Sequence, residues 1–84
     1  MSAVYITFPS VTGAMEGKKL LDRRGIRASL LRTPEALRKR GCGYSLRISR
    51  GTELEAKALL EGWDVKFERI FLEDPRGRWQ EVAL

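Results

Sequence analysis

The 84-residue chain contains no histidine and only one cysteine, Cys42. Without histidine, neither a Ser-His-Asp triad nor a Cys-His pair can form. One cysteine and no histidine also exclude a zinc site built by a single copy of the chain, and no internal disulfide is available. Glycine-rich phosphate loops of the Walker or Rossmann type are missing as well. We therefore expect no metal, no cofactor and a reducing, cytoplasmic location.

Long apolar runs are also missing. The apolar stretches fall far short of the roughly 18 residues that a membrane helix needs, and no basic-then-apolar leader opens the sequence. Hydrophobic residues make up 43% of the chain and charged residues 32%, which is typical of a globular domain. We expect a single domain over residues 1–84 without membrane contact, its core at about 3–72 and a hairpin or tail at 73–84.

The charge is unbalanced towards basic residues. Sixteen Lys and Arg residues face eleven Asp and Glu residues, which gives a formal net charge of +5. A basic domain attracts anions, including nucleic acids, phosphate metabolites and acidic proteins. The alternative is that this charge only keeps the protein in solution.

The apolar periodicity predicts alternating strands and helices. Strands are expected over 3–8, 26–32, 44–49 and 65–72, and longer helices over 11–24 and 53–61. The change of alternation in the last of these strands suggests a bulge near Glu68-Arg69. Asp74-Pro75-Arg76-Gly77 predicts a tight turn, after which 78–84 could pair back as a fifth strand or remain a frayed tail.

Short polar residues and glycines predict where the helices begin and end. The expected signals are an N-cap at Ser10, a stop at Gly25, a short helix starting at Thr33-Pro34-Glu35, a capping box at Thr52 and Glu55, and a stop at Gly62.

The order of these elements predicts an α+β fold. A βαβ unit, a short helix and a second βαβ unit form a ferredoxin-like two-layer sandwich, with an optional extra C-terminal strand. Right-handed crossovers place both long helices on one face of the sheet. The other face is expected to be open or covered by a partner subunit.

Cys42 lies between Gly41 and Gly43, in a predicted loop between the short helix and a strand. Flanking glycines would leave the sulfur uncovered and let a ligand approach the backbone. A lone cysteine is otherwise a small buried hydrophobic residue, and this alternative stays open.

Cations surround Cys42 in the sequence, with Lys39 and Arg40 before it and Arg47 after it. Positive charge favours the thiolate, the nucleophilic form of cysteine, whereas the C-terminal end of the short helix disfavours it. We expect the cations to dominate and to support a reactive thiol. With no second cysteine, Cys42 could hold a persulfide or a mixed disulfide but could not run a complete thioredoxin-type cycle.

The segments Phe8-Pro9-Ser10, Thr33-Pro34 and Cys42-Gly43 occur in the order and spacing of a known family. Over about residues 4–72, the chain resembles the putative selenium/sulfur carrier protein-like family, small bacterial domains of selenium metabolism. It departs from the family pattern at Lys39-Arg40-Gly41, where relatives carry small residues, and at Val11-Thr12, where a histidine is frequent. The resemblance implies that Cys42 is a thiol carrier rather than the nucleophile of a stand-alone enzyme. Its partner would be a sulfur- or selenium-transfer protein.

Two alternatives of other classes remain. Arg40-Gly41-Cys42-Gly43-Tyr44 is similar to the third-strand signature of RNA-recognition domains, with Tyr5 as a second stacking platform. Cysteine stands where a stacking aromatic is expected, and we therefore expect no nucleic-acid partner. A homodimeric interaction module, formed through the sheet face and Trp79, is the other alternative.

Overall fold

The structure, a computed structural model, describes residues 3–38 and 43–82. Within these residues there are five strands and two α-helices, and one short 3-10 helix lies between the second and third strands. The elements are β1 (Ala3–Phe8), α1 (Val11–Arg23), β2 (Ser29–Arg32), η1 (Glu35–Leu37), β3 (Tyr44–Ser49), α2 (Glu53–Gly62), β4 (Arg69–Glu73) and β5 (Trp79–Glu81).

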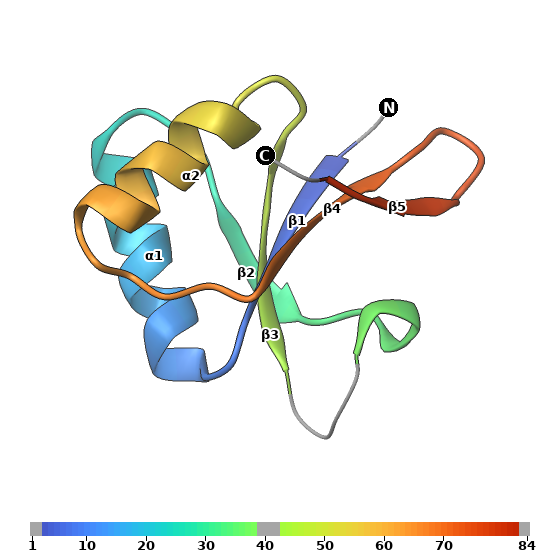
Figure 1. Ribbon diagram of the computed structural model, residues 1–84, viewed down its shortest axis with the longest axis horizontal. Coiled ribbons are helices and arrows are strands. Elements are labelled where there is room, and N and C mark those ends of the chain that lie inside the picture. The colour runs from blue at the N-terminus through green and yellow to red at the C-terminus, as the bar shows by residue number, and fades with distance from the viewer. Residues whose placement is uncertain (1–2, 39–42, 83–84) are drawn as a thin grey trace.

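The strands form one antiparallel sheet in the order β2-β3-β1-β4-β5. Central strand β1 pairs with β3 on one side and with β4 on the other, so that Tyr5 lies opposite both Arg47 and Phe71. Both α-helices cover the same face of the sheet, while η1 and β5 lie towards the other face (Figure 1). The expected α+β class and the expected placement of the two helices are therefore confirmed.

The core lies between the sheet and the two helices. Val4, Ile6 and Phe8 alternate along β1 and are fully buried, together with Leu21 of α1 and Leu60 of α2. Burying a large apolar side chain contributes about 1.5–3 kcal/mol, so this alternation is what holds the two layers together.

The opposite face of the sheet is partly covered by the chain itself. Tyr5 and Phe71 point to this face, yet they are only 9% and 8% exposed. The ring of Trp79 in β5 packs edge-on against Tyr5, with 4.9 Å between ring centroids and an angle of 78°. The open face expected from the sequence is thus narrower than predicted, because the β4–β5 hairpin folds over part of it.

The structure confirms the predicted boundaries of α1 and the predicted turn before β5. The Ser10 side chain accepts a hydrogen bond from the Gly13 N–H and caps α1. Gly25 follows α1 with a φ of 83°, a conformation that favours glycine. The expected turn is closed by a hydrogen bond from the Gly77 N–H to the Asp74 carbonyl, and β5 pairs with β4 after it.

Two of the remaining helix-boundary predictions are wrong. Thr33 does not cap η1. Its hydroxyl bonds the Ser45 hydroxyl, and the N-cap position of η1 is occupied by Pro34. Thr52 precedes α2 with φ −103° and ψ 5° and makes no side-chain cap. Its hydroxyl donates to the Ser49 carbonyl instead, so no capping box forms. The predicted stop at Gly62 is confirmed, since α2 ends at this residue, and the left-handed residue beyond it is Asp64, with a φ of 57°.

Two strands are shorter than predicted. β2 begins at Ser29 rather than at 26, and β4 begins at Arg69 rather than at 65. The Glu68 N–H donates to the Thr7 carbonyl just before β4 starts. Arg69 is the strand partner of the same Thr7, so two consecutive residues face one residue of β1, the arrangement that the predicted bulge near Glu68-Arg69 requires. In the described part of the chain, neither helix combines the length and apolar content needed to cross a membrane.

Candidate functional site

The candidate site is the loop that connects η1 to β3 and carries the cysteine. The described chain stops at Arg38 and resumes at Gly43. Lys39, Arg40, Gly41 and Cys42 lie outside the described residues, and their expected roles stay predictions. What the structure places is the pair of chain segments from which this loop departs and to which it returns.

Gly43 lies close to the residues that precede η1. The Thr33 N–H donates a hydrogen bond of 3.0 Å to the Gly43 carbonyl. A Cβ atom added at Gly43 would lie 3.1 Å from the Thr33 hydroxyl oxygen and 3.9 Å from Cγ of Arg38. The two ends of the loop therefore lie side by side. Gly43 is small because Thr33 packs against it, a reason that the sequence alone does not reveal.

A buried hydrogen bond fixes this base. The hydroxyl oxygens of Thr33 and Ser45 are 2.6 Å apart, and the two residues are 4% and 0% exposed. Each hydroxyl satisfies the other, and no buried side-chain nitrogen or oxygen among the described residues lacks a partner. The loop thus starts from a rigid base, because unsatisfied hydroxyls at this depth would be costly.

Of the expected cations only Arg47 is described, and Arg38 is a further cation close in sequence. Arg38 is half-buried at the start of the loop. Arg47 is exposed on β3, three residues beyond Tyr44, which corresponds to about 10 Å along a strand. Arg47 instead lines a pocket with Arg27 and Arg50. Two described cations are therefore closer to the loop than Arg47: Arg38 at its start, and Arg32, which lies opposite Tyr44.

The two tyrosines of the RNA hypothesis lie on opposite faces of the sheet. Tyr44 pairs with Phe8 and packs against the core beneath the helices. Tyr5 faces the other side, where Trp79 covers it. Two rings on opposite faces cannot form one stacking platform, so the described geometry gives no support to RNA recognition of this kind. The described residues also contain no group of three or more His, Cys, Asp or Glu side chains suited to a metal ion.

One comparison with known proteins identifies the family. The sequence model of a family described as putative Se/S carrier protein-like matches residues 3–72. The chain belongs to this family. No curated protein and no solved structure matches the chain. The resemblance inferred from the sequence is thus confirmed, and the matched range of this Se/S carrier-like protein includes both ends of the loop as well as Cys42.

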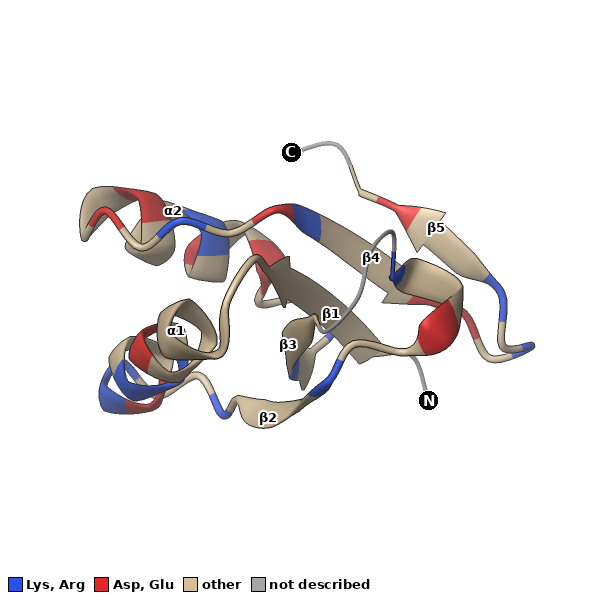
Figure 2. Cartoon of the chain, turned by 90° about the horizontal axis from the view of Figure 1, so that it is seen from below, with Lys and Arg blue, Asp and Glu red and all other residues tan. Residues whose placement is uncertain are grey.

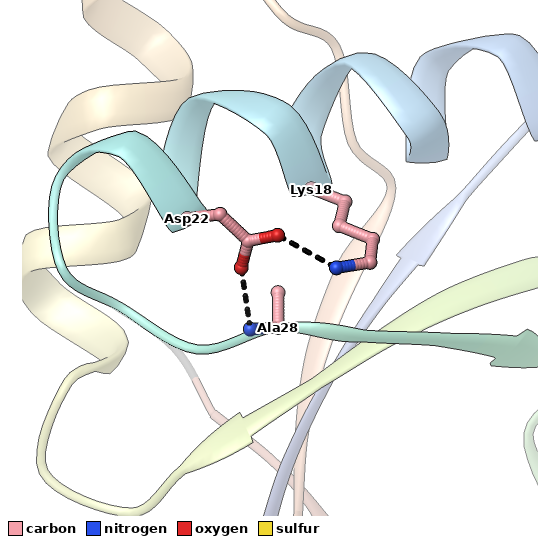
Figure 3. Close-up of polar contacts among 3 residues, drawn as sticks. All are labelled: Lys18, Asp22 and Ala28. Atoms are coloured by element: carbon pink, nitrogen blue, oxygen red, sulfur yellow. Dashed lines mark hydrogen bonds and ion pairs between the residues drawn. The ribbon is translucent and has the colours of Figure 1, made fainter.

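A polar clamp at the end of α1 of this Se/S carrier-like protein was not expected from the sequence. Asp22 accepts from Lys18 at 2.6 Å and from the Ala28 N–H at 3.2 Å (Figure 3). The hydrogen bond from Lys18, followed by that from Ala28, lowers the pKa of Asp22 below its ordinary value. The i,i+4 spacing of Lys18 and Asp22 could have indicated the first contact. The second contact, which holds the chain leading into β2, depends on the turn at Gly25 and could not be read from spacing.

Proposed function

We propose that this Se/S carrier-like protein carries sulfur or selenium on the thiol of Cys42 and delivers it to a partner protein. The observation that carries the proposal is the family match, whose range includes the only thiol in the chain. The rigid base at Thr33, Gly43 and Ser45 supports it, because a fixed attachment presents a short loop to a partner reproducibly.

The proposed transfer step is thiol–persulfide exchange. The Cys42 thiolate attacks the terminal sulfur of a persulfide on a donor protein. The bond between the donor's two sulfur atoms breaks, the donor cysteine leaves as a thiolate, and Cys42 becomes the persulfide. The transferred sulfur keeps its oxidation state, so no external oxidant or reductant enters. An acceptor thiolate reverses the step, and the absence of a second cysteine prevents an internal disulfide from discharging the cargo.

Local charge would assist the first step. Arg38 lies at the start of the loop, and Lys39 and Arg40 follow it in the sequence. Cations near a thiol favour the thiolate form that attacks. Under this proposal Gly41 and Gly43 serve the site by keeping side-chain bulk away from Cys42.

Intact mass spectrometry tests the proposal. The protein is incubated with a cysteine desulfurase and free cysteine, and the expected product is heavier by one sulfur atom. A reducing agent should remove the added mass, and Cys42→Ser should not acquire it. A protein that gains no mass beside a fully loaded desulfurase, or a Cys42→Ser variant that gains the same mass, would contradict the carrier role.

The pH dependence of Cys42 alkylation tests whether Arg40 and Arg47 favour the thiolate. The rate of native Cys42 alkylation against pH should show an inflection below the ordinary cysteine value of about 8.5. Arg40→Gln should raise this inflection. Arg47→Gln should raise it less, because Arg47 lies about 10 Å further along β3. A thiol that reacts only after denaturation would mean that Cys42 is a core residue.

We also propose that the fold is ferredoxin-like. The strand order β2-β3-β1-β4, antiparallel pairing throughout and both helices on one face support this assignment. In this arrangement β5 is an added edge strand. An experimental structure with a different order of the first four strands would refute it.

A further inference from the structure

A second feature lies at the far end of β3 from the cysteine loop. A pocket of about 470 Å³ opens there, lined by three arginines, Arg27, Arg47 and Arg50, and by the two serines Ser29 and Ser49. Five residue steps separate Tyr44 from Ser49, which corresponds to about 17 Å along a strand. The pocket is therefore distinct from the Cys42 site.

Strand register brings these residues together. Ser29 of β2 lies directly opposite Arg47 of β3. Ser49 follows two positions later on β3, so it shares the face of Arg47. Arg27 precedes β2 and Arg50 follows β3. Basic residues occur at both ends of β2 (Figure 2).

No acidic side chain is among the residues that line the pocket. In the described part of the chain, none of its three arginines forms an ion pair, whereas Lys18, Lys57 and Arg69 do. Of the carboxylates near the pocket, Asp22 binds Lys18 and the Ala28 N–H, and Glu53 accepts from the Gly51 N–H. Glu73 lies opposite the lining residue Ala3 but does not itself line the pocket. Three like charges around one concave site repel each other, and a bound anion relieves that repulsion.

We propose that this pocket binds the phosphoryl groups of a small phosphate ester or diphosphate. The planar fork of arginine matches two phosphate oxygens at once, and serine hydroxyls can donate to the remaining oxygens. Three guanidinium groups suit a multiply charged group with several oxygens better than a carboxylate, which has one charge and two oxygens. The volume lies in the range of small-ligand sites, about 300–1,000 Å³.

The location favours a small ligand over a nucleic acid. Single-stranded nucleic acids use a basic groove with aromatic rings for stacking. The pocket has no aromatic residue in its lining, and the nearest ring across the strands, Tyr5, is covered by Trp79. The inference does not depend on the carrier function, because none of these residues belongs to the Cys42 loop.

Isothermal titration calorimetry of the full chain with inorganic pyrophosphate tests the proposal. We expect saturable binding, which Arg27→Gln, Arg47→Gln and Arg50→Gln each weaken by about tenfold or more. Arg47→Lys should fall between wild type and Arg47→Gln, because it keeps the charge but loses the fork. Arg76→Gln, in the exposed β4–β5 turn, changes the net charge equally and should leave the affinity nearly unchanged.

Several results would overturn the phosphate site. One is the absence of saturable binding, and another is equal weakening by Arg76→Gln and the pocket variants. A third is tight binding of a single-stranded RNA that requires the same three arginines when pyrophosphate does not bind. Thermal unfolding of each variant checks that it is folded. Cys42→Ser should bind pyrophosphate like wild type, so failure of the carrier proposal would leave this result standing.

Discussion

At the scale of single residues, the hydroxyl pair of Thr33 and Ser45 decides how the cysteine loop is attached. Both side chains are polar, and both are buried where the two ends of the loop meet. A buried hydroxyl without a partner costs about 1–3 kcal/mol, whereas a satisfied pair contributes a modest net amount. The pair therefore favours one arrangement of the chain at the base of the loop, because any other arrangement would leave a buried hydroxyl without a partner.

Replacing Thr33 by valine should destabilise the protein by about 1–3 kcal/mol. The new side chain has nearly the same shape but leaves the Ser45 hydroxyl buried without its partner. Urea unfolding measures the loss.

The control for Thr33→Val is a double-mutant cycle. Ser45→Ala added to Thr33→Val should recover part of the lost stability, because no buried polar group then remains unpaired. Strictly additive losses in the double variant would show that the hydroxyls do not interact.

The residue scale also shows where sequence reasoning about the site succeeds and where it stops. The Cys42-Gly43 pair and its family resemblance could be read directly from the chain. The distance of Arg47 from the loop follows from the predicted strand over 44–49. The contact of Gly43 with Thr33 could not be read from the chain, because it depends on cross-strand register. For the same reason the grouping of Arg27 with Arg50 was not anticipated.

At the scale of elements, α1 packs closely enough on the sheet to require glycine in its interior. A Cβ at Gly17 would lie 3.0 Å from Cζ of Phe8, 3.2 Å from Leu46 and 3.3 Å from Leu60. Alanine normally favours a helix over glycine by about 1 kcal/mol. Here the crowding opposes that preference, since all three neighbours are fully buried.

Gly17→Ala should therefore destabilise the protein. Overpacking should cost about 1–3 kcal/mol, and the better helix propensity of alanine should offset about 1 kcal/mol of that cost. Gly62→Ala is the matched control, because no atom lies within 4 Å of the added Cβ at the end of α2. That variant should be unchanged or more stable by up to about 1 kcal/mol. Thermal unfolding compares the two, and a stabilising Gly17→Ala would mean that α1 is less tightly packed than described.

The Asp22 clamp joins α1 to the chain entering β2, and its contribution should depend on pH. The pKa of Asp22 is lowered in the folded protein. Its contribution is therefore fully present above the ordinary value of 3.8 and is lost as the pH falls through the lowered pKa. Asp22→Asn should be less stable than wild type at pH 7, and the difference should vanish in strong acid.

Urea unfolding of both proteins at pH 7 and at successively lower pH measures this difference. Glu61→Gln is the control, because Glu61 pairs with Lys57 within α2 and does not connect this helix to another segment. It should lose less stability than Asp22→Asn at pH 7. A gap between wild type and Asp22→Asn that persists unchanged into strong acid would show that the carboxylate charge is not its cause.

The element boundaries show why local signals fail in part. Ser10 and Gly25 act as predicted because their partners lie within a few residues. Thr52 has the spacing of a capping box with Glu55, but its hydroxyl bonds the Ser49 carbonyl in the preceding turn. Thr33 is likewise drawn away from η1 by a residue on β3. Caps are thus predictable where no competing acceptor or tertiary partner is available.

At the scale of the whole molecule, β3 separates the two sites proposed above. Its first residue, Tyr44, follows the Cys42 loop, and its last residue, Ser49, lines the arginine pocket. Under the two proposals, a partner protein engages the cysteine end and a small anion occupies the other end. The net charge of +5 acts over both ends and attracts polyanions without specificity.

This non-specific attraction leads to a prediction about RNA. Any affinity for single-stranded RNA should fall steeply with salt, because it rests on phosphate neutralisation alone, with a slope of about −0.7 per phosphate contacted. Tyr44→Leu, which keeps apolar bulk in the core but removes the ring, should leave that affinity nearly unchanged, since Tyr44 faces the helices. Fluorescence anisotropy across a salt series measures both effects. A loss of about 1–3 kcal/mol on Tyr44→Leu at physiological salt, the size of one base stacked on an aromatic ring, would restore the RNA hypothesis.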